Sequence, residues 1–97
     1  MRKVAIIGIG HSKFGRRQDV NVCELAFEAI KPALEDAGVG PEDVEFMPVG
    51  TIGMWYEEGL PAVMIADYCG ISGAGLARFE AACASGSAAF FAGYMAI

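Results

Sequence analysis

Cys83 stands in the segment 80–89 (EAACASGSAA), where an alternating strand pattern gives way to the small residues of a predicted helix. A cysteine at the N-terminus of a helix meets free backbone N–H groups and the positive end of the helix dipole, which favour the thiolate over the thiol. The same N–H groups are placed to stabilise an oxyanion on a carbonyl group that the sulfur attacks. Because the neighbouring side chains are small, a substrate can come close. The segment therefore predicts nucleophilic catalysis by Cys83.

The alternative interpretation of Cys83 is a small packing residue, since free cysteine is among the most buried residue types. Cys23, within an amphipathic helix, and Cys69, at a helix end, are both interpreted in that way. The three cysteines are odd in number and widely spaced, unlike the close pairs of a zinc site or the framework of a secreted disulfide protein. We therefore expect reduced thiols in the cytoplasm and no metal site.

Other residues that could carry chemistry are given structural interpretations. The glycines of segment 8–10 (GIG) follow a predicted strand, as in a dinucleotide-binding fingerprint, but Lys13 stands where the third glycine belongs. These glycines instead predict a tight exit from the strand. His11 is interpreted as a loop histidine without a catalytic role. Glu80 is close to Cys83 in sequence, but strand alternation can turn it away, so no role is assigned to it. The substrate-binding residues stay unknown at this stage.

The elements that must position Cys83 follow from hydrophobic periodicity. The predicted elements, in chain order, are a strand at 3–9, a helix at 22–37, a strand at 49–53, a loop at 55–59, a helix at 61–68, a strand at 76–81 and a helix from residue 83 onward. This β-α-β-α-β-α order predicts an α/β fold with a mostly parallel sheet and helices packed over it.

The helix at 22–37 carries the clearest signals. Its apolar residues recur at helical spacing, and Asn21 with Glu24 three residues later has the pattern of a capping box. Gly38 predicts the C-cap. Pro32 removes a backbone donor and is expected to kink the helix, at a cost of about 3 kcal/mol if nothing compensates. The helix is nevertheless predicted to continue, because the apolar stripe stays in phase beyond Pro32.

The chain is more apolar than a small independent domain needs to be. It has 97 residues, of which 55% are hydrophobic and 20% charged. Its last residues, 90–97 (FFAGYMAI), are apolar and contain no helix stop signal. Three strands are also few for a complete parallel sheet. We therefore expect residues 1–97 to be an incomplete N-terminal domain that stops within the helix of Cys83.

The charge balance excludes some partners. Twelve acidic residues against seven basic ones give a net charge of -5, which argues against nucleic acid as the main partner. No segment has the length and polarity of a membrane span or the cleavage site of a signal peptide. A cytoplasmic protein that associates with neither nucleic acid nor membrane is expected.

Four segments together carry a family resemblance: 4–10 (VAIIGIG), 13–15 (KFG), 34–38 (LEDAG) and 80–86 (EAACASG). They resemble the start of a thiolase, most of all the archaeal and sterol-carrier-type branch. The resemblance implies the N-terminal part of the layered αβαβα thiolase fold. It also implies that Cys83 is the nucleophile that takes an acyl group from acyl-CoA, for Claisen condensation or thiolysis of a 3-ketoacyl-CoA.

The resemblance has further implications. Coenzyme A thioesters would be the substrates, with no separate cofactor, and the subunits would form a homodimer or a dimer of dimers. The family's catalytic histidine in a Gly-His-Pro motif and its second cysteine lie far downstream, and neither motif occurs in this sequence. The 97-residue chain alone is therefore expected to be inactive.

Two alternatives share the same fold. A ketoacyl synthase or a hydroxymethylglutaryl-CoA synthase has a cysteine at the same structural place. A non-catalytic thiolase-like subunit, acting as a lipid carrier or as a scaffold in a multi-enzyme complex, would keep the fold without the downstream bases. The KFG segment at 13–15 and the CASG segment at 83–86 favour the thiolase interpretation.

Overall fold

A computed structural model of the chain describes residues 2–52 and 60–97. Its elements, in chain order, are α1 (Val22–Ala37), the 3-10 helix η1 (Pro41–Asp43), β1 (Phe46–Gly50), α2 (Pro61–Tyr68), β2 (Gly75–Phe79) and α3 (Ser85–Ala96). β1 and β2 pair in parallel, with Phe46 opposite Gly75 and Gly50 opposite Phe79. The predicted α/β class with a parallel sheet is confirmed. The predicted loop at 55–59 lies outside the described residues.

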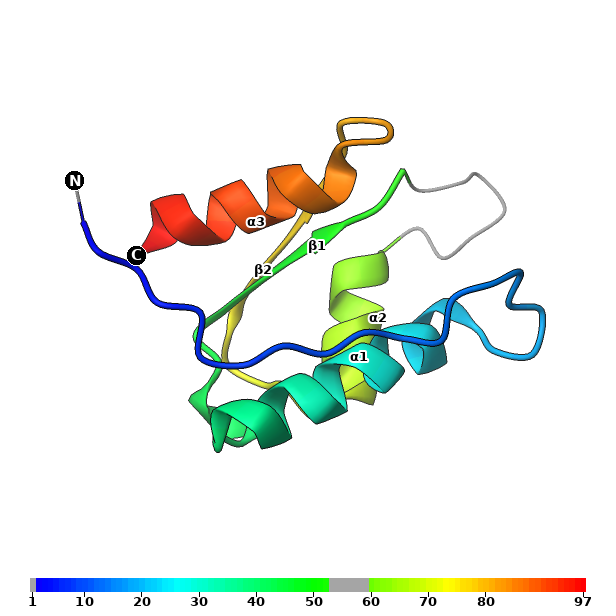
Figure 1. Cartoon of the computed structure of the whole chain (residues 1–97), viewed down its shortest axis with the longest axis horizontal. Coiled ribbons are helices and arrows are strands. Elements are labelled where there is room, and N and C mark those ends of the chain that lie inside the picture. Colours follow the sequence, from blue (N-terminus) through cyan, green and yellow to red (C-terminus); the bar gives the residue numbers. More distant parts are fainter. Residues whose placement is uncertain (1, 53–59) are drawn as a thin grey trace.

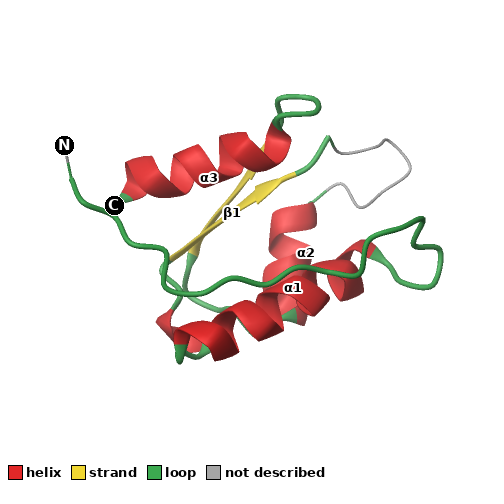
Figure 2. Ribbon diagram, in the orientation of Figure 1, coloured by secondary structure: helices red, strands yellow, loops and turns green. Residues whose placement is uncertain are grey.

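The sheet lies between two layers of helices (Figure 1). Figure 2 shows α3 along one face of the strands and α1 and α2 on the opposite side. Alternation along β1 produces this arrangement, because successive side chains of a strand point to opposite faces. Met47 and Val49 face the core shared with α1 and α2, whereas Pro48 faces Gly93 of α3.

The main core lies between β1 and the helices α1 and α2. Its buried members are Cys23, Met47, Ile65, Ala66, Cys69 and Ile71. The interpretation of Cys23 and Cys69 as packing residues is confirmed, because both are buried in this core. Burial, together with the nearby Cys23, raises the pKa of the Cys69 thiol, which keeps this thiol protonated at neutral pH.

The predicted caps of α1 are confirmed. The Asn21 side chain accepts a hydrogen bond of 2.8 Å from the Glu24 backbone N–H, and the Glu24 carboxylate accepts one of 2.9 Å from the Asn21 N–H. Gly38 ends the helix in the left-handed conformation, with φ 71°. The helix runs through Pro32 as one element, as the apolar stripe predicts.

The predicted strand at 3–9 is not paired in a sheet in the described part of the chain, so this prediction was wrong at the level of pairing. The segment instead runs along α1 (Figure 1). The Ile9 backbone N–H donates to the Asp36 carboxylate at 3.0 Å, so a side chain of the helix replaces the strand partner. A Cβ at Gly8 would lie 2.5 Å from the Ala33 carbonyl oxygen, so this crossing requires glycine.

The other two strands form, but β1 begins three residues earlier than the predicted range of 49–53. Just beyond β1, the Thr51 N–H still donates to the Phe79 carbonyl oxygen at 3.2 Å, and the Arg78 guanidinium donates to the carbonyl oxygens of Thr51 and Ile52. Pro48 is tolerated within β1 because a proline without an N–H suits an edge strand. Among the residues that the structure describes, no helix is long and apolar enough to cross a membrane.

Candidate active site

Cys83 lies in the tight turn that joins β2 to α3, and its side chain is exposed. The sequence placed it at the first residue of the helix. In the structure α3 begins at Ser85, and Ala84 is the N-cap, so Cys83 precedes the helix by two residues. Cys83 therefore lies before the helix N-terminus, in the turn between β2 and α3, which protrudes beyond the end of the sheet (Figure 1).

The turn contains a strained residue immediately before the cysteine. Ala82 has a φ of 50°, the one positive φ among the non-glycine residues described. For an L-residue this left-handed conformation costs about 1–2 kcal/mol. Surrounding contacts must therefore hold it, and residues held in this way are frequent at active sites.

The buried side chain of Ser85 supplies two of those contacts. Its Oγ accepts a hydrogen bond of 2.9 Å from the Ala81 N–H and donates one of 2.7 Å to the Ala82 carbonyl oxygen. Only 5% of Ser85 is exposed, which makes it the buried polar residue among those described. A third bond closes the turn, from the Ala84 N–H to the Ala81 carbonyl oxygen at 2.9 Å.

Glu80 adds a bond from the outer side of the turn. One carboxylate oxygen accepts a hydrogen bond of 2.6 Å from the Ala82 N–H. The sequence assigned no role to Glu80 because strand alternation can turn the residue away from Cys83. β2 ends at Phe79, however, so alternation no longer governs the next residue and its side chain reaches forward along the turn.

Gly50 determines how closely α3 approaches the sheet. A Cβ at this position would overlap the Ser85 carbonyl oxygen and would lie 2.6 Å from the Ser85 carbonyl carbon. The last residue of β1 thus touches the first turn of α3, which carries the Cys83 turn at its start. Sequence reasoning missed this role, although a glycine closing a strand is a recognised sign of close backbone approach.

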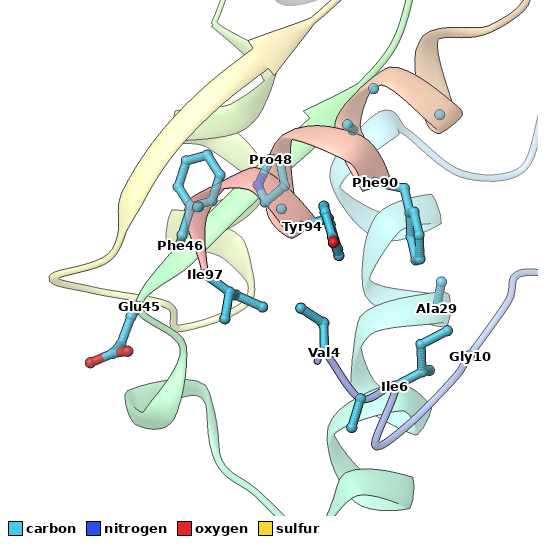
Figure 3. A pocket seen from close by; sticks show the side chains of 16 residues that line it. Val4, Ile6, Gly10, Ala29, Glu45, Phe46, Pro48, Phe90, Tyr94 and Ile97 are labelled. Atoms are coloured by element: carbon cyan, nitrogen blue, oxygen red, sulfur yellow. The ribbon is translucent and has the colours of Figure 1, made fainter. Parts of the chain in front are cut away.

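A separate groove of about 1140 Å³ opens between α3, β1 and the N-terminal segment, residues 4–10. Figure 3 shows Val4 and Ile6 on one side of it and Phe90 and Tyr94 on the other. Its lining is mainly apolar, and Cys83 is not among the lining residues. The groove is therefore distinct from the turn that carries the candidate nucleophile.

Residues 4–97 match the protein family described as "Thiolase, N-terminal domain". This chain belongs to the thiolase family. The family resemblance inferred from the four sequence segments is therefore confirmed.

Two archaeal thiolase relatives match most of the chain. An acetyl-CoA acetyltransferase of Methanothermobacter thermautotrophicus is 40% identical over 100% of this chain and 26% of its own length. One of Methanocaldococcus jannaschii is 41% identical over 92% of this chain and 23% of its own length. A beta-ketoacyl-[acyl-carrier-protein] synthase III of Listeria innocua is 39% identical, but over only 70% of this chain and 22% of its own. The chain thus spans about a quarter of the length of the acetyltransferase relatives.

The thiolase fold also has support from a solved structure. An acetyl-CoA acetyltransferase from Syntrophomonas wolfei superposes with a TM-score of 0.81 and 26% identity, over 91% of this chain and 23% of that chain. This superposition confirms the predicted fold class independently of the pairing of β1 with β2.

In this thiolase-family chain the loop between the N-terminal segment and α1 is held by Arg17. Its guanidinium donates to Glu28 at 2.6 Å and to Asp19 at 2.9 Å. These hydrogen bonds, first that to Glu28 and then that to Asp19, raise the pKa of Arg17. They also lower the pKa values of the Asp19 and Glu28 carboxyls. The sequence did not reveal the cluster, because Glu28 is 11 residues from Arg17.

His11 and the glycine segment behave as structural residues. The His11 ring interacts within its own loop, with its Nδ1 2.9 Å from the Ser12 carbonyl oxygen and its ring 5.6 Å from that of Phe14. Gly8 and Gly10 pack against the later turns of α1, at Ala29 and Ala33. A dinucleotide fingerprint would place its glycines at a helix N-terminus, so the structure opposes that interpretation.

Proposed function

We propose that the complete protein is an acyl-CoA acyltransferase of the thiolase type, and that Cys83 carries its acyl group. The observation that carries this proposal is the exposed thiol of Cys83 on a strained, hydrogen-bonded turn between a strand and a helix. Support for the substrate class comes from the two archaeal relatives that are named acetyl-CoA acetyltransferases.

In the first half-reaction the Cys83 thiolate attacks the carbonyl carbon of acyl-CoA. Negative charge moves onto the carbonyl oxygen, and in this proposal backbone N–H groups at the start of α3 stabilise it. The tetrahedral intermediate collapses by breaking the bond to the CoA sulfur. An S-acyl cysteine forms, and CoA leaves as a thiolate that takes up a proton.

In the second half-reaction a base removes an α-proton from a second acyl-CoA. The resulting carbanion attacks the acyl carbon on Cys83, which releases the cysteine thiolate and a 3-ketoacyl-CoA. Thiolysis is the reverse sequence. His11, the single histidine of the chain, interacts within its own loop. Because the chain spans about a quarter of its relatives' length, we propose that residues outside 1–97 supply the base.

Partners and location remain proposals of the same kind. A homodimer or a dimer of dimers, with acyl-CoA as substrate, fits the family membership of the chain. A cytoplasmic location fits the free thiols of Cys69 and Cys83. The Listeria synthase match covers less of the chain than the archaeal acetyltransferases do, so acetyltransferase activity is the function we propose.

The experiment that tests the function uses the full-length gene product. The protein is incubated with acetyl-CoA and quenched in acid, and acyl adducts are mapped by peptide mass spectrometry. We expect an acetyl group on Cys83, absent from Cys83→Ala and retained in Cys23→Ala, whose missing thiol is a buried packing group. A folded wild-type protein without an adduct on Cys83 would sink the acyltransferase proposal and favour a non-catalytic carrier or scaffold.

A further inference from the structure

Glu80 is the first residue after β2, and its carboxylate is close to the backbone that carries the candidate nucleophile. One oxygen accepts the hydrogen bond of 2.6 Å from the Ala82 N–H, and Cys83 follows directly. A bond this short between an ionised carboxylate and a backbone N–H is of the stronger, charge-assisted kind. Glu80 is exposed, so nothing in the core requires an acidic residue here.

The bond acts on the least favourable residue of the turn. Ala82 has a φ of 50°, a backbone conformation that residues with a Cβ rarely adopt. Without outside support, the peptide before Cys83 would relax towards a common backbone region and would turn the thiol in another direction. Ser85 binds the Ala82 carbonyl oxygen through its Oγ and its backbone N–H, whereas the Ala82 N–H is bound by the Glu80 side chain.

We propose that Glu80 is a positioning residue, which fixes the direction of the Cys83 thiol by holding the Ala82 N–H. The inference rests on the proposed acyl transfer, because it names a residue that prepares the nucleophile for that reaction. Glu80 does not touch the acyl group in this role. It acts through the backbone of Ala82 alone.

The charge of Glu80 and its hydrogen-bond acceptor can be removed separately, which makes the proposal testable. A positioning role needs the acceptor and not the charge, so removal of the Glu80 charge alone should leave the acylation rate of Cys83 nearly unchanged. Loss of the hydrogen-bond acceptor should slow acylation, because misplacement of a nucleophile is costly. Glutamine keeps an acceptor oxygen without the charge, whereas alanine removes both.

The first measurement is the single-turnover rate of Cys83 acetylation in the full-length protein. We expect Glu80→Ala to lower the rate at saturating acetyl-CoA by about tenfold, with little change in the half-saturating concentration. Glu80→Gln should restore the rate to within about twofold of the wild type. Asp67→Ala, which removes an exposed carboxylate from α2, is the matched control and should have no effect. A Glu80→Gln variant as slow as Glu80→Ala would overturn the proposal.

The second measurement asks whether Glu80 acts through Ala82. Glycine adopts a positive φ without steric cost, so the turn should need less support in an Ala82→Gly background. We expect the effect of Glu80→Ala to shrink by at least about half on a logarithmic scale in that background. Equal effects in both backgrounds would contradict a role through the conformation of Ala82.

Amide hydrogen exchange separates this proposal from the proposed function. The Ala82 amide should exchange about tenfold or more faster in Glu80→Ala than in the wild type, and Glu80→Gln should retain protection. If wild-type Cys83 takes no acetyl group but the exchange changes as expected, the acyltransferase function fails while the hold on Ala82 stands. If acetylation occurs but exchange at Ala82 is the same in Glu80→Ala, the positioning role is wrong and the function stands.

Discussion

Ser85 and Ser87 have the same hydroxyl group and lie on the same helical turn, yet the fold uses them differently. Ser85 is buried and bonds both the Ala81 N–H and the Ala82 carbonyl oxygen, whereas Ser87 is exposed. A buried hydroxyl that makes two hydrogen bonds can fix a turn. A buried polar group that loses its hydrogen-bond partner is also cut off from water, so breaking these bonds is costly. The Cys83 turn therefore depends on one serine of the CASGS segment.

At this scale we predict that Ser85→Ala destabilises the full-length protein by about 1–3 kcal/mol, since it leaves the Ala81 N–H without its partner and removes one of the two donors to the Ala82 carbonyl oxygen. Acetylation of Cys83 should slow in parallel. Ser87→Ala is the matched control and should change the free energy of unfolding by less than about 0.5 kcal/mol. Urea unfolding followed by circular dichroism measures both. A Ser85→Ala protein as stable as the control would contradict the role given to this hydroxyl.

At the scale of elements, the position of Cys83 depends on how α3 meets β1. Gly50 allows the backbone of Ser85 and Gly86 to lie directly against the strand end. α3 also carries apolar residues around its circumference, and Phe90, Phe91 and Met95 are exposed. Side-chain amphipathicity therefore cannot orient this helix. Backbone contacts at Gly50, the packing of Gly93 against Pro48 and the burial of Ala89 hold the helix in place.

We predict that Gly50→Ala destabilises the protein by about 1–3 kcal/mol, because the new Cβ forces α3 away from the strand. Gly86→Ala is the matched control at the same junction. A Cβ on Gly86 meets no atom within 4 Å, and alanine favours a helix over glycine by about 1 kcal/mol. Thermal unfolding should therefore show a lower midpoint for Gly50→Ala and an unchanged or higher one for Gly86→Ala. Equal midpoints would disprove the close contact.

At the scale of the whole molecule, charged side chains replace sheet pairing in holding the N-terminal segment. Asp36 binds the Ile9 N–H, and the Glu28 carboxylate binds both the Lys13 N–H and the Arg17 guanidinium. The Arg17 side chain is only 12% exposed, although its partners are more accessible. The attachment of residues 9–19 to α1 therefore depends on charged side chains and should depend on pH.

The direction of that dependence follows from the lowered pKa values of Asp19 and Glu28. Carboxyls with folded-state pKa values below the unfolded values, about 4, stabilise the fold above that pH and lose this effect as the pH falls through the folded-state values. We expect Arg17→Gln to be less stable than the wild type near pH 7, with the difference shrinking as the pH falls below the unfolded-state value of about 4 and through the lowered folded-state pKa values. The free energy of unfolding is measured by urea titration at several pH values. Arg16→Gln, at the exposed neighbouring residue, is the control and should be as stable as the wild type at each pH. A difference that persists at low pH would mean that Arg17 acts by packing alone.

Local interactions account for what the sequence predicted well. The caps of α1 at Asn21, Glu24 and Gly38 are contacts between residues a few positions apart, so their pattern is visible in the sequence. The helix Pro61–Tyr68 was predicted with its observed bounds for the same reason. The nucleophile candidate Cys83 was recognised from small residues between a strand and a helix, a signal that is also local in the chain.

The sequence by itself determined the class of fold, the family and the position of Cys83 between β2 and α3. Tertiary structure decided the details that depend on residues far apart in the chain. Segment 3–9 has the composition of a strand, but pairing needs a partner, and α1 takes that place in the described chain. Gly50 meets Ser85 only after the strand and the helix have packed, so no sequence pattern records their contact. Glu80 bonds Ala82 because β2 ends one residue before it, and that endpoint is set by pairing with β1.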